Sequence, residues 1–79
     1  MKITTFPNPF SGFTNVDLEG VEFKQGQWVL YDILGRRMKT ATFHEKSFQI
    51  SVHGLVSGTY LLKINLDGNT AGTGKLMIQ

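Results

Sequence analysis

The stretch GTYLLKINLDG, residues 58–68, carries the clearest strand signal in the chain and decides its fold class. Apolar and polar residues alternate along it, so every second side chain points to the same face of an extended strand. One of these faces is entirely apolar and holds Tyr60, Leu62, Ile64 and Leu66. The stretch therefore predicts a β-strand with one face in a hydrophobic core and the other toward water.

The same period of two recurs on both sides of this strand. In QWVLYD, residues 27–32, Trp28 and Leu30 share one face while Val29 and Tyr31 share the other. This pattern predicts a strand that is covered on both sides. Glycines, prolines and asparagines interrupt the apolar runs at short intervals, as turns do. We expect about seven strands, near residues 2–6, 13–18, 27–32, 36–43, 47–52, 59–66 and 71–79.

Several short strands with a turn about every 8–12 residues are typical of an antiparallel sandwich or a small barrel. The inward residues of two such sheets form one common core, while one face of each sheet remains wet. The residues that we expect to be buried in this core are Trp28, Leu30, Ile50, Tyr60, Leu62, Ile64 and Leu76.

Composition narrows the functional classes. The chain has 79 residues, enough for one domain, and its 41% hydrophobic and 18% charged residues are typical of a globular protein. There is no cysteine, which excludes disulfides and thiolate metal sites. The net charge of +2 comes from scattered basic residues, whereas nucleic-acid binding needs a denser basic stripe. No apolar run approaches the roughly 20 residues of a membrane span.

The segment WVLYDILGRRM, residues 28–38, contains a hairpin corner. Gly35 supplies a positive φ without steric cost, and Asp32 accepts hydrogen bonds from backbone amides of the loop. We expect Arg36 to lie close to Asp32 across the neck of the hairpin, where opposite charges attract. Such a corner has a structural explanation, but a loop of defined shape is also a good surface for recognition.

No constellation of residues indicates catalysis. The carboxylates fall mostly at strand ends and turns, where we expect them to face water, and His44 and His53 have no ligand partners at metal-site spacing. The segment 72–74, GTG, indicates a strand bend or bulge, and DGN at 67–69 indicates a hairpin turn. We therefore predict neither an enzyme nor a bound metal or cofactor. Exposed aromatic residues leave a carbohydrate-binding platform open, with Phe10, Phe13 and Tyr31 as its candidates.

Four short motifs occur in a defined order: FPNPF, VLYDILGRRM, ISVHGLVSGTYLLKI and GKLMIQ. In this order and at these separations the chain resembles the C-terminal sorting domain of the type IX secretion system of Bacteroidota (Por secretion system sorting domain, type A-like). The resemblance extends from Ile3 to Gln79. It departs from the family pattern at Thr59, where an aliphatic residue is frequent, and at Gln79, which replaces a basic terminus.

The resemblance assigns the candidate recognition residues, motif by motif. The opening P-N-P corresponds to Pro7, Asn8 and Pro9, and the Y-D-x-x-G-R/K corner to Tyr31, Asp32, Gly35 and Arg36. The L-x-x-G-x-Y-x-L segment corresponds to Leu55, Gly58, Tyr60 and Leu62, and the terminal K-L/F to Lys75 and Leu76.

The resemblance also implies a fold and a role. The fold is an all-β, small antiparallel immunoglobulin-like β-sandwich of about seven strands. Residues 1–79 would be a single C-terminal sorting domain, excised from a larger secreted protein. It would direct a covalently linked N-terminal cargo through the periplasm and across the outer membrane, to the cell surface or the medium. The implied partners are the type IX export machinery and a sortase-like peptidase, with no cofactor, no nucleic acid and no membrane span.

Two surfaces are candidates for recognition by that machinery. One is the YDILGR corner, together with a front loop around Pro7 and Pro9 that we expect to lie nearby. The other is the last strand, whose backbone can pair with a partner strand if it lies at a sheet edge. Two other functions stay open: a carbohydrate-binding or adhesive accessory module of a secreted enzyme, and a purely structural accessory domain.

Overall fold

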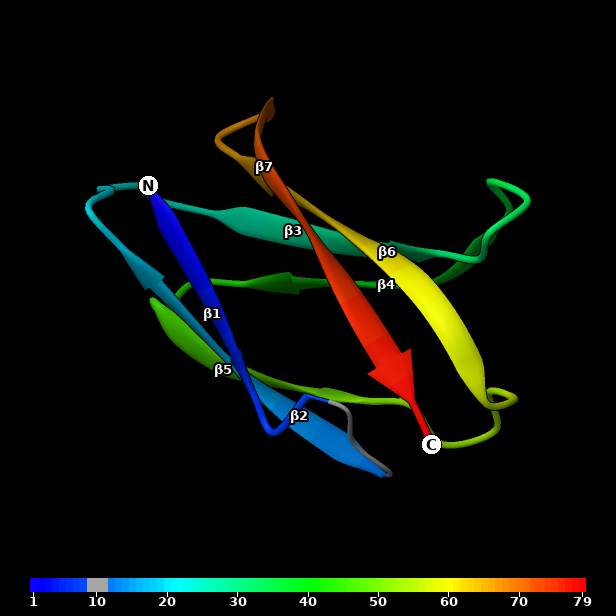
Figure 1. Cartoon of the computed structure of the whole chain (residues 1–79). Coiled ribbons are helices and arrows are strands. Elements are labelled where there is room, and N and C mark those ends of the chain that lie inside the picture. Colours follow the sequence, from blue (N-terminus) through cyan, green and yellow to red (C-terminus); the bar gives the residue numbers. More distant parts are fainter. Residues whose placement is uncertain (9–11) are drawn as a thin grey trace.

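The computed structural model describes residues 1–8 and 12–79, and it contains seven strands in two antiparallel sheets (Figure 1). The strands follow the alternating segments of the sequence to within one or two residues at each end. They are β1 Lys2–Phe6, β2 Phe13–Glu19, β3 Gly26–Tyr31, β4 Arg37–Phe43, β5 Ser47–Ser51, β6 Gly58–Leu66 and β7 Asn69–Ile78. The described residues contain no helix that is long and apolar enough to cross a membrane.

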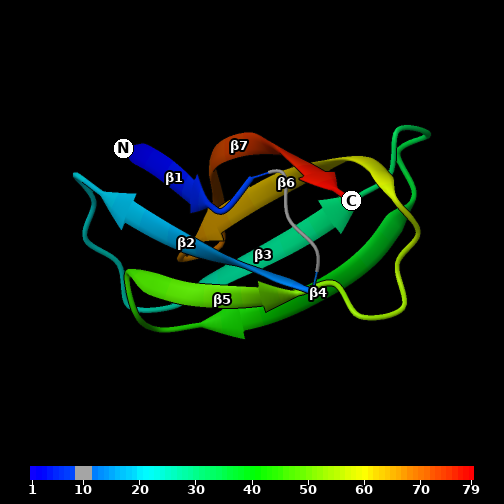
Figure 2. The same cartoon turned by 60° about the horizontal axis from the view of Figure 1, so that its bottom comes forward.

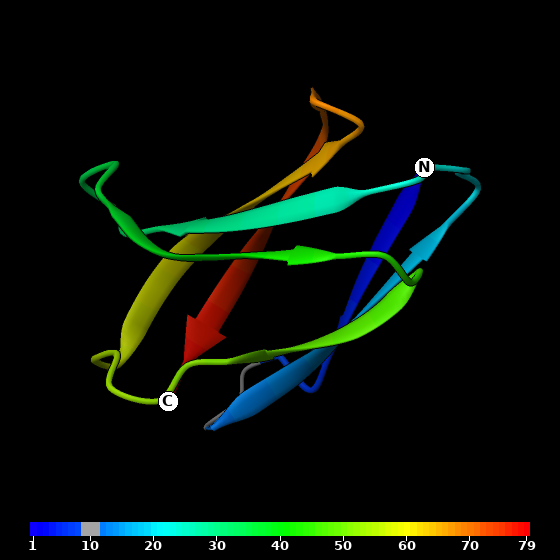
Figure 3. The ribbon, with the colours of Figure 1, turned by 180° about the vertical axis from the view of Figure 1, so that it is seen from behind.

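The strands form a sandwich of the predicted class. One sheet has the order β1-β2-β5 and the other the order β4-β3-β6-β7, and the two sheets face each other in Figure 2. The turn from β4 to β5, well seen in Figure 3, carries the chain from one sheet to the other. β4 pairs with β3 at the edge of the four-stranded sheet. Immunoglobulin domains of the variable type have an additional strand at this position.

The core lies between the two sheets and confirms the sequence prediction. The side chains expected to be buried expose between 0% and 4% of their surface: Trp28, Leu30, Ile50, Tyr60, Leu62, Ile64 and Leu76. Trp28 lies on the third strand, where immunoglobulin domains carry a buried tryptophan, and pairs with Ile64 of β6. In antibody domains a disulfide between the sheets packs against this tryptophan. This chain has no cysteine, and Trp28 packs in a cluster of apolar side chains instead.

The outer face of β3 is also covered, but less completely. Val29 is buried between its neighbours Thr40 on β4 and Lys63 on β6, while Tyr31 is half-buried. The central position of β3 explains this, since a strand paired on both sides has cross-strand side chains over its outer residues.

The turns predicted around the last hairpin are confirmed. Asp67 and Gly68 both have positive φ, 49° and 87°, and form the two-residue turn that joins β6 to β7. The register then shifts so that Ala71 is an extra residue in β7, next to Gly72, which is the bulge that the GTG segment indicates. A Cβ on Gly72 would lie 2.9 Å from Ile3 Cδ1, so this glycine lets β1 approach β7.

The two ends of the sandwich differ in what they carry. Met1 lies at one end, and the opposite end carries the corner between β3 and β4, the loop before β6 and the last residue, Gln79 (Figures 1 and 2). A segment that precedes residue 1 would therefore leave the domain at the end away from the corner.

Candidate functional site

The corner between β3 and β4 is held together by one carboxylate. Asp32 Oδ1 accepts hydrogen bonds from the backbone N–H of Leu34 and of Arg36, each at 2.9 Å. Asp32 Oδ2 accepts a third from Arg36 Nε at 2.6 Å. Gly35 has a φ of +82°, a conformation that strains any residue with a side chain. The predicted contacts of Asp32, Gly35 and Arg36 are thus all present, and together they give the loop one defined shape.

The donors around Asp32 also change its acidity. The backbone N–H of Arg36, with the Arg36 side chain and the Leu34 N–H, holds the pKa of Asp32 below its ordinary value. Only 12% of the Asp32 side chain is exposed, against 69% of that of Arg36. At neutral pH the carboxylate is therefore ionised and fully engaged inside the loop, whereas much of the guanidinium group faces water.

This pKa shift predicts that the stability of the fold depends on pH. A carboxyl group with a lowered pKa stabilises the fold above its unfolded pKa, about 3.9, and this stabilisation is lost as the pH falls through the lower folded value. Asp32→Asn should melt below wild type at pH 7, and the difference between the two melting temperatures should shrink toward pH 2. Thermal melts at several pH values measure this, and a difference that stays constant over that range would contradict it.

The loop before β6 is held by a second local device. Tyr60 Oη donates a hydrogen bond to the backbone carbonyl of Val56 at 2.6 Å. A tyrosine near the start of this strand that bonds back to the preceding loop is the tyrosine corner of immunoglobulin-like sandwiches. Gly58 lies between the two residues with a φ of +150°, and Leu55 packs against the core. The L-x-x-G-x-Y motif is therefore explained by the geometry of this loop.

The two loops meet and enclose an apolar hollow of about 330 Å³. Ile33 and Leu34 line it from the corner, and Val56 lines it from the loop before β6. Met38 contributes from β4, where a register shift opposite Leu30 and Tyr31 makes it an extra residue. A bulge of this kind re-aims a side chain, and here it directs Met38 to the hollow. The structure thus brings together two motifs that lie about twenty residues apart in the sequence.

The other two motifs also meet each other. The side-chain amide of Asn8 donates to the carbonyl of Lys75 at 2.9 Å and accepts from the N–H of Met77 at 3.0 Å. This is the pair of bonds that one residue of a parallel neighbouring strand would make. Since β7 is an edge strand, Asn8 occupies the part of its free edge that lies beside these two residues. Leu76, between them, points into the core.

Asn8, in the described part of the front loop, therefore lies at β7 and not at the corner, so for this part the expectation that the loop is near the corner is wrong. Asn8 bonds to β7, which forms one edge of its sheet, while the corner joins β3 to β4 at the other edge. Thr14, fully buried on β2, fixes the loop further by donating to the carbonyl of Pro7 at 2.8 Å. Pro9 lies outside the described residues, as does Phe10.

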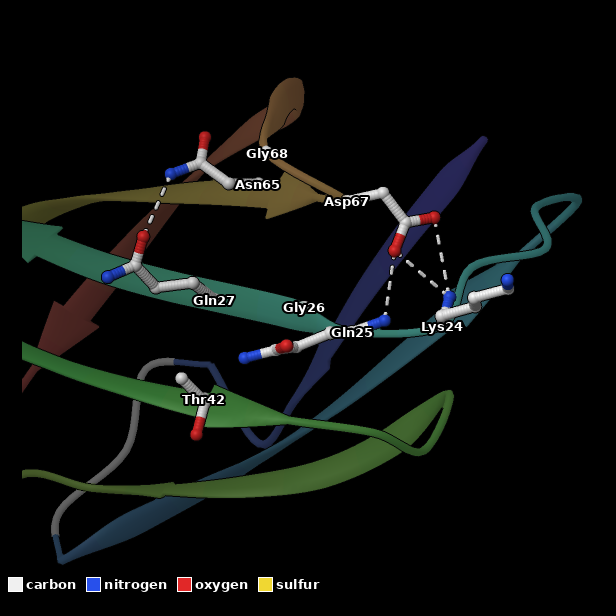
Figure 4. A pocket seen from close by; sticks show the side chains of 8 residues that line it. All are labelled: Lys24, Gln25, Gly26, Gln27, Thr42, Asn65, Asp67 and Gly68. Carbon is white, nitrogen blue, oxygen red and sulfur yellow. Dashed lines mark hydrogen bonds between the residues drawn. The ribbon is translucent and has the colours of Figure 1, made fainter.

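A polar hollow lies near the end of the sandwich that carries Met1 (Figure 4). At its rim Asp67 accepts hydrogen bonds from the backbone N–H of Lys24 and of Gln25, at 3.1 and 3.0 Å. We expected the carboxylates at turns to face water, and Asp67 is indeed exposed; its side chain in addition ties the segment before β3 to the β6–β7 turn. Sequence spacing gave no signal for this contact, since the partners are more than forty residues apart.

The remaining candidates for chemistry and binding lie on the surface. His44 and His53 are exposed, and no group of three acidic, histidine or cysteine side chains able to hold a metal occurs within residues 1–8 and 12–79. Among the aromatic candidates, Phe13 is exposed and Tyr31 is half-buried. Phe13 lies on the outer face of its sheet together with Phe6, which is 72% exposed.

Comparison with known proteins assigns the family. A family model described as "Secretion system C-terminal sorting domain" matches residues 4–79, essentially the whole chain. No curated protein matches the sequence. The match covers all four motifs whose places in the fold are given above, and the seven-stranded sandwich agrees with the architecture that the resemblance implies. The chain belongs to the family of C-terminal sorting domains of the type IX secretion system.

Proposed function

We propose that this domain is a non-catalytic sorting signal that is read as a folded surface. As a member of its family it is a C-terminal signal for type IX secretion, it interacts with the secretion machinery, and it is attached to a cargo that reaches the cell surface or the medium. We further propose that the cargo precedes residue 1, crosses the periplasm with this domain, and is released from it by a sortase-like peptidase after export.

The pairing of the family motifs is the observation that supports recognition of a folded surface. Within the described residues, polar side chains of three of these motifs fix backbone: Asp32 fixes the corner, Tyr60 the loop before β6, and Asn8 the edge of β7. A partner that recognises a folded surface loses less binding energy to ordering when the loops of that surface are already held in one conformation.

The position of Met1 relative to the corner also fits this role. Met1 lies at the end opposite the corner, so a cargo attached there would leave the corner accessible to a partner. A small sandwich with the cargo at one end and the fixed loops at the other can be bound by machinery without contact to the cargo. Such an arrangement suits a signal that serves cargo proteins of unrelated structure.

Export of a reporter tests the proposal. Residues 1–79 are fused behind a periplasmic reporter that carries a signal peptide, in a host with a working type IX system. We expect the reporter at the cell surface or in the medium, and in the periplasm when the host lacks the type IX translocon. Mass spectrometry of the exported reporter should show a product without the domain, as cleavage requires.

Two results would contradict the proposal. A fusion whose domain is folded, yet whose reporter stays in the periplasm of the competent host, would exclude a sorting function. Binding of the isolated domain to polysaccharide, lost in Phe6→Ser with Phe13→Ser, would instead favour the carbohydrate-binding module, because these two exposed rings share one sheet face.

A further inference from the structure

Three aliphatic side chains at the corner end are unusually exposed. Ile33, Leu34 and Val56 expose 76%, 74% and 75% of their surface, more than any other large hydrophobic residue that the structure describes. They come from two loops, and they line the same hollow. Contiguous exposed apolar surface of this kind on a small domain indicates a site of protein interaction.

These side chains are carried on fixed loops. The two backbone hydrogen bonds to Asp32, from Leu34 and Arg36, set the backbone beneath Ile33 and Leu34, and the bond from Tyr60 sets the carbonyl of Val56. A surface that is already in its bound shape loses little conformational entropy when a partner docks, so its contacts contribute more fully to affinity. The hollow is concave, which suits a projecting side chain of a partner better than the flat surface of a lipid bilayer.

The charges at its rim indicate the partner's chemistry. Asp32 is the acidic residue that lines the hollow, and its carboxylate is engaged within the loop. Arg36 also lines the hollow and pairs with Asp32, but 69% of its side chain is exposed, and the next residue, Arg37, is exposed as well. Asp32, Arg36 and Arg37 together carry a net charge of +1. A complementary partner presents an apolar side chain beside a carboxylate, since opposite potentials across an interface favour association.

The rival surface is less accessible. Strand addition to β7 needs the free backbone groups of that edge, but Asn8 already bonds to Lys75 and Met77 there. A partner strand would have to displace this amide before it could pair. The corner needs no such rearrangement.

We propose that the apolar corner surface, defined by Ile33, Leu34, Val56 and Met38, is the docking surface for a protein of the export machinery. That protein inserts an apolar side chain into the hollow and places a carboxylate against Arg36 or Arg37. The inference rests on the proposed function, and it specifies which surface of the domain the machinery reads.

Two corner variants test this with the reporter fusion. Ile33→Ser with Leu34→Ser removes two exposed side chains and leaves the backbone bonds to Asp32 in place. Val56→Ser changes the other loop independently and keeps the carbonyl that accepts from Tyr60. We expect both to melt close to wild type and to export at least about tenfold less reporter, as the loss of central interface contacts does.

Matched variants separate the inference from the proposed function. Phe6→Ser with Phe13→Ser removes two exposed apolar side chains from the other sheet, 72% and 48% exposed, and we expect normal export. If the wild-type fusion itself is not exported, the proposed function fails. If it is exported and the corner variants are exported equally, this inference alone is wrong.

Two further outcomes would overturn the inference by favouring another surface or another partner. Loss of export in Lys75→Glu with Met77→Glu, together with normal export of the corner variants, would assign recognition to β7. Binding of the isolated domain to vesicles of phosphatidylglycerol and phosphatidylcholine, lost in the corner variants, would assign the corner to a membrane surface. We expect no vesicle binding.

Discussion

Replacing Leu62 by alanine is expected to lower the free energy of unfolding by about 2–5 kcal/mol. Leu62 is completely buried at the middle of β6, opposite Leu30 of β3 and Gly74 of β7. The glycine opposite it has no side chain with which to fill the cavity that truncation leaves. A domain of 79 residues has a total stability of only about 4–12 kcal/mol, so the variant should be close to unfolding.

Denaturant unfolding followed by circular dichroism measures this loss, and Leu61→Ala is its matched control. Leu61 is the preceding residue of the same strand, but its side chain lies on the outer face and is 50% exposed. Its truncation should change the free energy of unfolding by only about 0.5 kcal/mol. Equal losses in the two variants would mean that the assignment of the two faces of β6 is wrong.

Replacing Gly26 by alanine is expected to destabilise the fold through a steric conflict in the core, by about 1–3 kcal/mol. A Cβ at Gly26 would lie 2.2 Å from the ring of Phe43, its cross-strand partner. That ring cannot move freely, because it stacks on Phe48 with centroids 4.0 Å apart and meets the edge of Phe23 at 5.6 Å.

A second substitution identifies the cause. Phe43→Leu removes the ring that meets the new Cβ, so Gly26→Ala should cost much less stability in the Phe43→Leu background than in wild type. The double-mutant cycle gives this coupling from four unfolding curves. If the two effects simply add, the conflict with Phe43 is not the reason for glycine at this position.

Periodicity predicted the fold because each inward face is continuous along its strand. In β6 the four inward residues are all apolar, and in β3 Trp28 and Leu30 share the core face, so the parity of the sequence assigns the core without knowledge of strand order. The Asp32–Gly35 corner was predictable for a related reason, since its hydrogen bonds join residues no more than four positions apart.

Contacts between distant segments left no comparable signal. The bond between Asn8 and Lys75 spans 67 positions, and that between Lys24 and Asp67 spans 43. The hollow at the corner also left no signal in the sequence. Val56 and Ile33 belong to different loops, and only the pairing of β3 with β6 brings them to the same hollow. Their residue types alone did not distinguish exposed aliphatic side chains from core residues.

Both halves of the family pattern thus have physical roles in the fold. The Y-D-x-x-G-R and L-x-x-G-x-Y segments build two fixed loops around one hollow, while the P-N-P and K-L segments join the front loop to the last strand. The sequence could not show which motifs are neighbours. That pairing depends on the order of the strands in the sheets, which local patterns do not encode.

Recognition of a folded surface is tested most directly by measuring export and folding in the same fusions. The three fusions carry the wild-type domain, Leu62→Ala and Leu61→Ala; neither residue lines the apolar corner surface. The exported share of the reporter should fall in Leu62→Ala and stay at the wild-type level in Leu61→Ala, in step with the folded fraction of the domain. If Leu62→Ala is unfolded at the assay temperature and still exports as well as wild type, the machinery reads a linear sequence, and a folded docking surface is excluded.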